Sequence, residues 1–457
     1  MEFKKNEVLT VEIQDIGSEG EGIAKVDGYP IFIKDAIPGD IVKIKIIKAK
    51  KTYGYGRLEE MIQPSKDRVE PRCPVARQCG GCSIQHYSYK KQLEYKQNKV
   101  KNCLERIGGF TGIEEKMAPI LGMEDPWYYR NKAQFPVGLN KEGSIITGFY
   151  AGRTHSIIDN THCYIQAKIN EEILEIIKEF LEQYHISPYQ EESHTGLVRH
   201  VLTRVGFVTG EIMVCLILNG KTLPNADKLI ERLIEIDGMK SISMNINQEK
   251  TNKILGKEVK TLWGSDTITD YIGDVKYQIS PLSFYQVNPI QTKVLYGKAL
   301  EYAELKGEET VWDLYCGIGT ISLFLAQKAK KVYGVEIIPE AIEDARKNAQ
   351  LNHMENVEFF VGKAEDILPK QYEENKVYAD VIVVDPPRKG CDETLLNTMI
   401  TMEPKRIVYV SCDPATLARD LKILCGNGYE LEKVQVVDQF AHTSHVETVV
   451  LLKHRRK

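Results

Sequence analysis

Two short stretches of the sequence place a reactive side chain directly after an apolar run. Asp385 follows the run 381–384, and Cys412 follows the run 407–410 and one serine. Apolar runs that stop at a polar residue next to proline are typical of buried parallel strands that end in a turn. Ligands of open α/β sheets bind beyond the carboxyl ends of the strands, so Asp385 and Cys412 are predicted to share that edge. A carboxylate and a thiol at that edge indicate covalent chemistry on a bound substrate.

A glycine-bearing turn predicts a nucleoside cofactor. The predicted strand 310–314 leads into the turn 315–320, which opens a helix, and the next predicted strand ends at Glu336. Such a turn brings backbone close to a ligand, and an acid about 20 residues further on can hold two ribose hydroxyls. The third glycine of the dinucleotide pattern is missing, which favours S-adenosylmethionine (SAM) over NAD. Cys316, inside the turn, is interpreted as a packing residue.

Three cysteines around a pair of glycines predict a metal centre. Cys73, Cys79 and Cys82 lie close together, and small residues between them let the chain wrap a centre. A tetrahedral centre needs a fourth ligand, for which Cys103 and Cys163 are candidates. Spacing alone does not choose between these two, nor between zinc and iron-sulfur. The spacing differs from that of radical enzymes, so the centre is not interpreted as catalytic.

Composition limits the classes of protein to be considered. The chain of 457 residues has a net charge of −4, so any basic surface that binds nucleic acid must be local. No apolar stretch is long enough to span a membrane, and the first residues lack the apolar part of a secretory signal. We therefore expect a cytoplasmic protein whose ten cysteines are thiols or metal ligands. The length predicts two or three domains.

Residues 1–60 are predicted to form a small β domain. Alternating apolar runs are separated by glycine-bearing turns, and they span residues 8–13, 29–33 and 41–47. The next segment, 48–57, interleaves cations with tyrosines, and residues 41–57 include no acid. Cations that hold phosphate and rings that stack on bases suit single-stranded RNA, although lysines also protect exposed edge strands. The polar, proline-bearing segment 63–71 predicts a linker.

The middle of the chain, residues 61–270, is predicted to mix helices and strands. Spacing indicates helices at 88–106 and 170–184, and paired strands at 198–209 and 210–218. Polar residues at 129–132, and Arg199 with His200, are either phosphate contacts or ordinary surface groups.

The motifs together resemble a known enzyme family. Segments 17–24 and 37–40 are similar to the TRAM domain, a five-stranded OB-like module that binds RNA. With the cysteine group, the whole resembles the RNA (uracil-5-)-methyltransferases, in the iron-sulfur branch that modifies 23S ribosomal RNA. The resemblance covers nearly the whole chain, and its further motifs are residues 283–288, 313–319, 385–390, 411–414 and 445–449.

The resemblance implies a fold, two cofactors and a set of site residues. The fold would be α/β and multidomain, with an OB-like β-barrel at 1–60, a central α+β domain with a metal cluster at 61–270 and a Rossmann-like, SAM-dependent methyltransferase domain at 271–457. A [4Fe-4S] cluster would be bound by Cys73, Cys79, Cys82 and Cys163. SAM would be contacted by Gln286, Tyr315, Glu336 and Asp385. Cys412 would be the nucleophile and Glu447 the base, in a monomer that acts on 23S rRNA.

Methylation of uracil at C5 needs a nucleophile and a separate base. C5 becomes electron-rich only after a thiolate has added to C6, and it can then take the methyl group of SAM. The adduct must next lose its C5 proton and expel the thiolate, which Cys412 and Glu447 would achieve together. The site is therefore expected to favour thiolate, helped by the N-terminus of a helix at 415–425. Asp413, where the family commonly has Asn, is a departure whose carboxylate would raise the pKa of the thiol.

Three other functions stay open at this point. A methyltransferase acting on an exocyclic nitrogen would use the Asp-Pro-Pro at 385–387 and would need no thiol. An RNA-binding assembly factor would leave the fold catalytically idle, which the intact set of site residues argues against. A tRNA-directed member of the same family is the closest alternative; by resemblance, such members lack the TRAM-like domain and the cluster cysteines.

Overall fold

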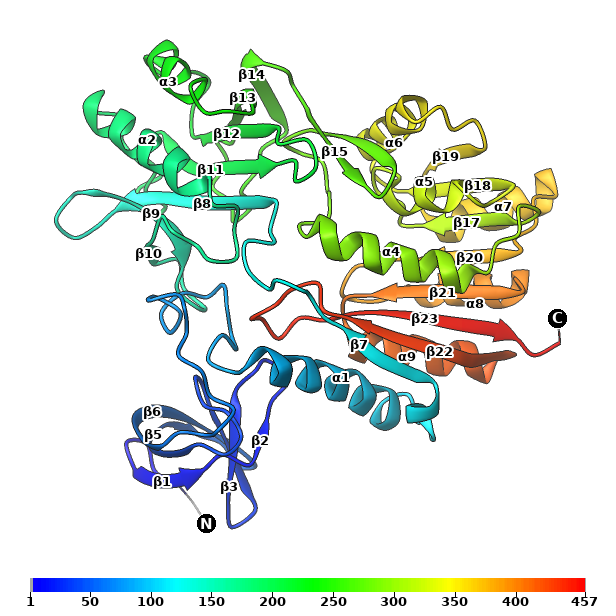
Figure 1. Ribbon diagram of the computed structural model, residues 1–457, viewed down its shortest axis with the longest axis horizontal. Coiled ribbons are helices and arrows are strands. Elements are labelled where there is room, and N and C mark those ends of the chain that lie inside the picture. Colours follow the sequence, from blue (N-terminus) through cyan, green and yellow to red (C-terminus); the bar gives the residue numbers. More distant parts are fainter. Residues whose placement is uncertain (1–2, 457) are drawn as a thin grey trace.

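An eight-stranded mixed sheet organises the carboxy-terminal half of the computed structural model, which describes residues 3–456 (Figure 1). Its strand order is β19-β18-β17-β20-β21-β23-β22-β7. The strands span Val357–Val361 (β19), Lys331–Glu336 (β18), Thr310–Leu314 (β17), Val381–Val384 (β20), Arg406–Ser411 (β21), Glu447–His454 (β23), Tyr429–Val437 (β22) and Met117–Leu121 (β7). The first five in this order are parallel, β23 is antiparallel to both of its neighbours, and β7 is parallel to β22. The predicted parallel sheet is present and continues into an antiparallel part.

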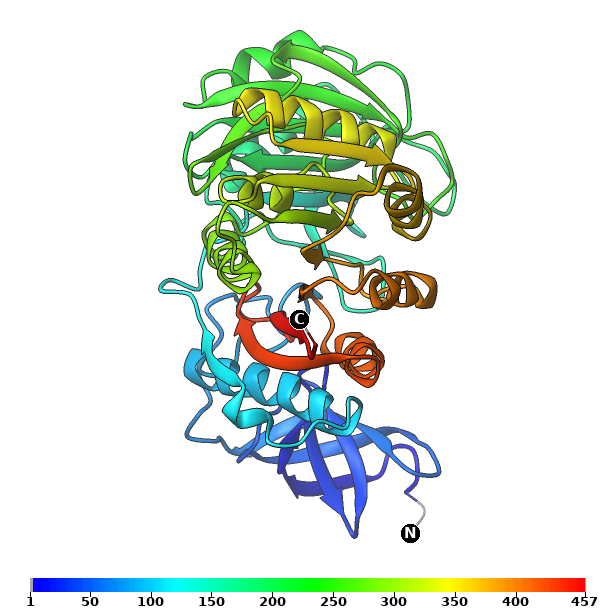
Figure 2. The same cartoon turned by 90° about the vertical axis from the view of Figure 1, so that its right-hand side faces the viewer.

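The central strands are apolar on both faces because helices cover both. In β20, Val381 and Val383 enter one core, whereas Ile382 and Val384 enter the other. One face is covered by α4 (Pro289–Ala303), α5 (Thr320–Ala326) and α6 (Pro339–Leu351). The other is covered by α1 (Tyr89–Arg106), α7 (Ala364–Asn375), α8 (Glu393–Met402) and α9 (Pro414–Gly426). Figure 2 shows α4 on one side of the strands and α8 and α9 on the other, which is the expected Rossmann-like layering.

Two elements from the first third of the chain complete this sheet. Helix α1, predicted from its spacing, packs against α9, and β7 pairs with β22. Without β7, the strand β22 would end the sheet with unpaired backbone groups. A division of the chain at residue 270 does not anticipate this crossing, because the partner of β7 lies near the other end of the sequence.

A six-stranded sheet forms the predicted amino-terminal β domain. Its order is β1-β5-β6-β4-β3-β2, with β1 at Val8–Glu12, β2 at Asp15–Ile16, β3 at Gly22–Val26, β4 at Tyr29–Ile33, β5 at Ile41–Ala49 and β6 at Gly54–Gln63. The resemblance implies five strands, and the two-residue β2 is the addition. The sequence does not predict β6, because it holds Gly54 and Gly56. Glycine leaves room there, since a Cβ on Gly56 would make a tight contact of 3.0 Å with the end of the Ile44 side chain.

A buried ion pair fixes this β domain to the segment that follows. Asp40 is fully buried, and Arg68 donates to its carboxylate from Nε at 3.0 Å and from Nη2 at 2.5 Å. The N–H groups of Ile37 and Ser65 donate to the same carboxylate. Although burial raises the pKa of Asp40, these four donors hold that pKa below its ordinary value. The predicted linker at 63–71 is therefore an anchored segment.

A seven-stranded sheet occupies the middle of the chain. Its order is β10-β9-β8-β11-β12-β13-β14, with strands at Ile157–Asp159, Ile145–Tyr150, Lys132–Leu139, Val198–Val205, Ile212–Leu218, Met239–Ile246 and Glu258–Gly264 respectively. The remaining elements are α2 (Asn170–Gln183), α3 (Ala226–Leu233), the 3-10 helix η1 (Ile113–Glu115) and the hairpin of β15 (Ile268–Ile272) and β16 (Val275–Ile279). The predicted helix at 170–184 and the predicted strand pair, β11 with β12, are both present.

Among residues 3–456, no helix combines the length and the apolar character that crossing a membrane requires.

Candidate active site

The carboxyl ends of the parallel strands open into a cleft of about 2020 Å³. Its walls come from the eight-stranded sheet, from the end of β13 in the central sheet and from the cysteine-bearing segment. The residues that the resemblance assigns to the cofactors and the chemistry all line it: Cys73, Cys79, Cys82, Cys163, Gln286, Tyr315, Glu336, Asp385, Cys412 and Glu447. One cavity therefore joins the residues expected to bind SAM, those expected to react and those expected to hold a metal.

Strand direction explains why Cys412 and Glu447 meet. β20 and β21 are parallel neighbours, so Asp385 and Cys412 follow them at one edge, as predicted. β23 is antiparallel to β21, with Thr448 opposite Ser411, so its first residue lies where β21 ends. That first residue is Glu447, which is 5% exposed and close enough to Cys412 for its charge to act on the thiol.

The glycine turn after β17 has a left-handed backbone at three positions. The angle φ is 65° at Tyr315, 54° at Gly317 and 81° at Gly319. Glycine adopts this conformation freely, whereas Tyr315 adopts it at a steric cost, which is a common feature of ligand sites. Glu336 accepts hydrogen bonds from the N–H groups of Gly317 at 3.2 Å and Ile338 at 3.1 Å. The acid expected to hold ribose hydroxyls therefore also fixes the turn.

Gln286 lies on the loop that leads into α4. Asn131 donates from Nδ2 to the Gln286 carbonyl at 3.0 Å, and the fully buried Arg204 donates to the Ser283 carbonyl in the same loop. The Gln286 side chain lies near the hydroxyl of Tyr296, a buried residue of α4 that lines the cleft and hydrogen-bonds the Thr320 hydroxyl at 3.1 Å. The sequence does not single out Tyr296, because an aromatic residue on the inner face of a helix is typical of core packing.

The cleft concentrates carboxyl groups of raised pKa. Burial raises the pKa of Asp385 to about 7. Burial, and then the charge of Asp385, raise the pKa of Glu447 well above its ordinary value. Burial also raises to about 7 the pKa of Asp313, a fully buried residue of β17 outside the cleft lining. Because a nearby cation favours the ionised form of such groups, the pocket suits a positively charged ligand.

The surroundings of the Cys412 thiol favour its protonated form. Burial, followed by the charges of Glu447 and Asp385, raises its pKa to about 12, while the guanidinium of Arg388 acts in the opposite direction. The expectation that the site itself favours thiolate is therefore wrong. The strands β23 and β20 place the carboxyls of Glu447 and Asp385 close to Cys412, and their negative charge raises the pKa of the thiol.

Asp413 caps the helix that follows Cys412. Its Oδ1 accepts hydrogen bonds from the N–H groups of Ala415 at 2.9 Å and Thr416 at 3.1 Å. The carboxylate is thus directed to the first turn of α9. The expected effect of Asp413 on the pKa of the Cys412 thiol stays a prediction.

Four cysteines gather in another part of the cleft. Burial raises the pKa of the Cys82 thiol, and the nearby Cys163, Cys79 and Cys73 raise it further. Cys103 lies instead on α1, against the core of the eight-stranded sheet. In the part of the chain that the structure describes, no three His, Cys, Asp or Glu side chains are arranged to hold a metal ion. The thiols share one region, but they do not form a finished ligand shell.

Backbone N–H groups lie near two of these sulfurs. Gly81 N–H donates to Cys79 Sγ at 3.3 Å, and the nearby N–H groups of Ile165 and Gln166 act to lower the pKa of the Cys163 thiol. Hydrogen bonds to cysteine sulfur are among the features that tune iron-sulfur centres. The donor chemistry, four unpaired thiols with N–H groups around them, therefore fits a metal-sulfur centre.

Two polar groups in the central region have a structural role. Arg199 is 4% exposed, and its guanidinium donates to the carbonyls of Asn247 and Glu249. His200 is buried, and burial lowers its pKa to about 3. The interpretation of this pair as phosphate contacts is wrong. By contrast Phe284, within a motif noted in the sequence, is 73% exposed at the cleft.

Two family models match the chain. Residues 88–455 match tRNA (Uracil-5-)-methyltransferase, and residues 2–58 match the TRAM domain. An uncharacterized RNA methyltransferase of Halalkalibacterium halodurans is 56% identical over 450 residues, which cover 98% of this chain and 97% of that protein. One of Clostridium tetani is 52% identical over 452 residues, which cover 99% of this chain and 97% of that protein.

A solved structure matches almost the full length. It is the Pyrococcus abyssi tRNA (uracil-54, C5)-methyltransferase in complex with S-adenosyl-L-homocysteine, with a TM-score of 0.79 and 29% identity over 97% of this chain and 100% of that chain. A match of that extent includes the amino-terminal β domain. The expectation that tRNA-directed members lack such a domain is therefore wrong. The chain belongs to the tRNA (uracil-5-)-methyltransferase family, and it is a SAM-dependent RNA (uracil-5-)-methyltransferase with an amino-terminal TRAM domain.

Proposed function

We propose that the protein methylates C5 of a uridine in 23S ribosomal RNA, with Cys412 as the nucleophile and Glu447 as the base. The observation that carries the proposal is the sheet edge shared by Cys412, Glu447 and Asp385 beside the glycine turn. A thiol next to a separate buried acid is the pair that C5 methylation needs. A methyltransferase acting on an exocyclic nitrogen has no use for the thiol.

The reaction balances in three steps. The Cys412 thiolate adds to C6 of uracil, and the electron pair of the C5–C6 double bond moves toward O4. C5 then attacks the methyl carbon of SAM, and the carbon–sulfur bond breaks to release S-adenosylhomocysteine. Finally the Glu447 carboxylate takes the C5 proton, the C5–C6 double bond forms again and the bond between C6 and Cys412 breaks. The base must leave its stack to be attacked at C6, so a loop uridine or a flipped base is the substrate.

Proton placement supports an ordered reaction. Burial raises the pKa of both Cys412 and Glu447, which favours the protonated form of each group. A sulfonium beside Asp385 and Glu447 favours the ionised forms of the carboxyls. Once ionised, Glu447 is ready to act as a base, while its charge raises the pKa of the Cys412 thiol and Arg388 acts in the opposite direction. Binding of SAM would therefore prepare the base.

We assign four residues of the cleft to SAM. Glu336 would accept the ribose hydroxyls, as an acid at the end of the second strand does in nucleotide-binding folds. Asp385 would face the positive charge of the cofactor, and Gln286 and Tyr315 would line the same wall. In this assignment residues 271–457 carry the methyl transfer, residues 61–270 the metal centre and residues 1–60 the RNA contacts.

A uridine in tRNA is the second candidate substrate. The tRNA (uracil-54) enzyme of Pyrococcus abyssi supports it, since that structure matches this chain over nearly its whole length. Mapping of 5-methyluridine in ribosomal and transfer RNA, from cells that lack this protein, separates the two candidates. Loss of a 23S signal supports the proposal, and loss confined to tRNA would replace it with the second candidate.

We further propose that Cys73, Cys79, Cys82 and Cys163 bind a [4Fe-4S] cluster with a structural role. The gathering of the four thiols and the N–H groups around Cys79 and Cys163 support it. Bound there, the cluster would tie the segment 73–82 to Cys163, and it would not act on the substrate. Zinc is the alternative for the same ligands.

Two substitutions test the division of labour between nucleophile and base. Cys412→Ala cannot begin the reaction, so it should form no RNA adduct and transfer no methyl group. Glu447→Gln keeps the nucleophile, so it should methylate and then stall as a denaturation-resistant protein–RNA band that carries label from methyl-labelled SAM. The double variant should lose this band. Normal turnover of Glu447→Gln would remove Glu447 from the mechanism, and a labelled adduct in Cys412→Ala would move the nucleophile to another cysteine.

A further inference from the structure

The loop 438–446 joins β22 to β23 and ends immediately before Glu447. Val437 and Glu447 lie opposite one another in the strand register, so this loop closes a hairpin at the proposed base. The loop has two faces. Its cleft face carries Phe440, Thr443 and His445, and its buried face carries Asp438, Gln439 and His442.

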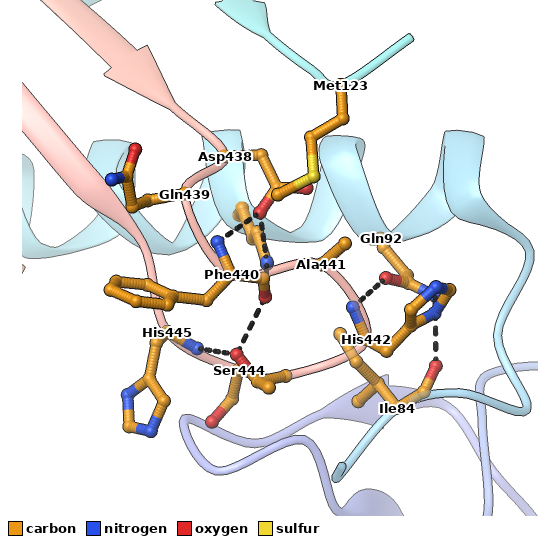
Figure 3. A network of polar contacts seen from close by, with 12 residues as sticks. Ile84, Gln92, Met123, Asp438, Gln439, Phe440, Ala441, His442, Ser444 and His445 are labelled. Carbon is orange, nitrogen blue, oxygen red and sulfur yellow. Dashed lines mark hydrogen bonds and ion pairs between the residues drawn. The ribbon is translucent and has the colours of Figure 1, made fainter. Parts of the chain in front are cut away.

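A buried ion pair attaches the loop to α1. Lys96 and Asp438 are both 0% exposed, and Lys96 Nζ donates to Asp438 Oδ1 at 2.5 Å and to the Phe440 carbonyl at 2.9 Å. The hydroxyl of Tyr89, also on α1, donates to Asp438 Oδ2 at 2.8 Å. Figure 3 shows Asp438 directed toward α1 while the Phe440 ring points away from it. A buried ion pair is weak evidence for stability, so we interpret this one by the position in which it holds the loop 438–446.

A second set of contacts holds the middle of the loop. Gln92 of α1 accepts from His442 N–H at 2.8 Å, and its amide nitrogen lies 3.1 Å from His442 Nδ1 (Figure 3). The N–H groups of Ser83 and Ile84, next to Cys82 in sequence, donate to the His442 carbonyl at 3.0 Å and 3.1 Å. Ser83 Oγ accepts from Ser444 N–H at 3.0 Å. The loop is thus fixed from its buried face.

We propose that Lys96 and Asp438 are positioning residues for Glu447, which hold its carboxyl where it meets C5 of the covalent adduct. The inference rests on the proposed function, in which only the last step needs Glu447. Cys412 is held by β21 and α9, outside this network. Disturbance of the loop should therefore slow elimination and spare addition and methyl transfer. A misplacement of about 1 Å can cost about 100-fold in rate.

Single-turnover experiments with methyl-labelled SAM and RNA separate these steps. In Lys96→Met, methyl transfer into the adduct should stay within about twofold of normal, while release of methylated RNA should slow by about 10- to 100-fold. Methylated adduct should then accumulate. If both steps slow equally, or if release is unchanged, the inference is overturned.

Two tyrosine-to-phenylalanine variants, each of which removes one buried hydroxyl, provide a second test if Lys96→Met does not fold. The buried Tyr129 hydroxyl donates to the Ala441 carbonyl of the loop at 2.9 Å, and the buried Tyr429 hydroxyl donates to the Pro404 carbonyl at 3.0 Å, at the opposite end of β22. Tyr129→Phe should accumulate methylated adduct, and Tyr429→Phe should not. Equal behaviour of the two variants would overturn the inference.

Glu447→Gln, run in parallel, separates failure of this inference from failure of the proposed function. If Glu447→Gln stalls as adduct but Lys96→Met and Tyr129→Phe do not, only the positioning role is wrong. If Glu447→Gln releases product normally, the proposed base is wrong, and the positioning role falls with it.

Discussion

At the scale of single residues, the surroundings of the Cys412 thiol hold it neutral. Burial and the adjacent carboxyls raise its pKa to about 12. Only the thiolate reacts with iodoacetamide, so alkylation of Cys412 at pH 7.5 should be slower than that of a free cysteine, whose pKa is about 8.5. The rate should keep rising about tenfold per pH unit beyond pH 9. Peptide mass spectrometry of Cys412 measures the alkylation rate at each pH. A rate that stops rising near pH 8.5 would contradict the raised pKa.

The two forms of the cofactor supply a matched control for this charge effect. SAM carries a sulfonium, whereas S-adenosylhomocysteine has a neutral sulfur and nearly the same shape. If a cation beside Asp385 and Glu447 prepares the site, alkylation of Cys412 should be faster with SAM bound than with S-adenosylhomocysteine bound. Equal rates with the two ligands would show that cofactor charge does not act on the thiol.

Asp385 links stability to pH in the same pocket. Burial raises its pKa to about 7 in the folded protein, against about 3.9 in an unfolded chain. Between these values the folded state holds a proton that the unfolded state has lost, so the contribution to stability is lost as pH rises through about 7. At pH 8 the Asp385→Asn variant should therefore be more stable than the native protein by about 1–4 kcal/mol in unfolding free energy. This gain would appear as a higher denaturant concentration at the unfolding midpoint. At pH 4 the difference should nearly vanish, and an equal difference at both values would contradict the linkage.

At the scale of elements, the Asp40–Arg68 ion pair anchors the β domain. Asp40 is 0% exposed and Arg68 18% exposed in their side chains. Arg68→Met leaves the carboxylate buried without its cation, which should cost about 3–5 kcal/mol of unfolding free energy at pH 7. Because the pKa of Asp40 is lowered in the folded state, the loss should shrink as pH falls below about 4 and the carboxylate takes a proton.

A surface ion pair of the same domain provides the comparison. Arg57 pairs with Glu59, with side chains 63% and 35% exposed. Arg57→Met should change the unfolding free energy by less than about 1 kcal/mol. Denaturant unfolding of both variants measures the contrast, and losses of similar size would show that the Asp40 contact does not anchor the domain.

Which elements the sequence could predict depends on where their signals lie. Helices α1 and α2 and the pair β11–β12 follow from local spacing, because the face that each buries repeats along a few turns or residues. Strand β7 is specified by pairing with β22 at the far end of the chain, which no local pattern records. Strand β6 was hidden by Gly54 and Gly56, whose missing side chains make room for packing. Local sequence therefore predicts elements better than it predicts their partners.

The same limit applies to the site. Asp385 and Cys412 could be placed because each ends a strand, and strand ends meet at one edge in a parallel sheet. The raised pKa of Cys412 could not be predicted from the sequence, since it depends on burial and on charged side chains of other strands. Tyr296, which lines the cleft, was not singled out, and Arg199, which is buried, was interpreted as a phosphate contact or a surface group. Only the packed structure separates a cleft residue from a core residue.

At the scale of the whole molecule, the basic part of the TRAM domain should contribute phosphate contacts. Lys48, Lys50 and Lys51 are exposed near the junction of β5 and β6. Replacing all three by alanine should weaken RNA binding and lower the slope of log affinity against log salt by about 2, at about 0.7 per lost contact. SAM binding should be unchanged. This substitution is cleaner than deletion of residues 1–60, which would leave Arg68 without its partner.

Three other lysines make a matched control. Lys306, Lys328 and Lys330 are exposed near the amino ends of β17 and β18, the sheet edge opposite the cleft. Their replacement by alanine removes the same charge, so a general loss of charge would lower the salt slope in both triple variants. Filter binding across a salt series measures the slopes. Equal slopes in the native protein and the Lys48/Lys50/Lys51 variant would mean that these lysines are only a solvated edge.

The proposed cluster joins parts of the chain that lie far apart in sequence, and two cysteines test it most sharply. Cys163 lies with Cys73, Cys79 and Cys82 in the cleft, whereas Cys103 lies on α1. Protein prepared without air should be brown and contain iron and acid-labile sulfide. Cys163→Ser should lose both and unfold more easily, because metal binding is coupled to folding, while Cys103→Ser should keep its iron. Iron and sulfide analysis of the two variants measures the difference. Stoichiometric zinc without sulfide would replace the cluster by a zinc site, and loss of iron in Cys103→Ser alone would move the fourth ligand to α1.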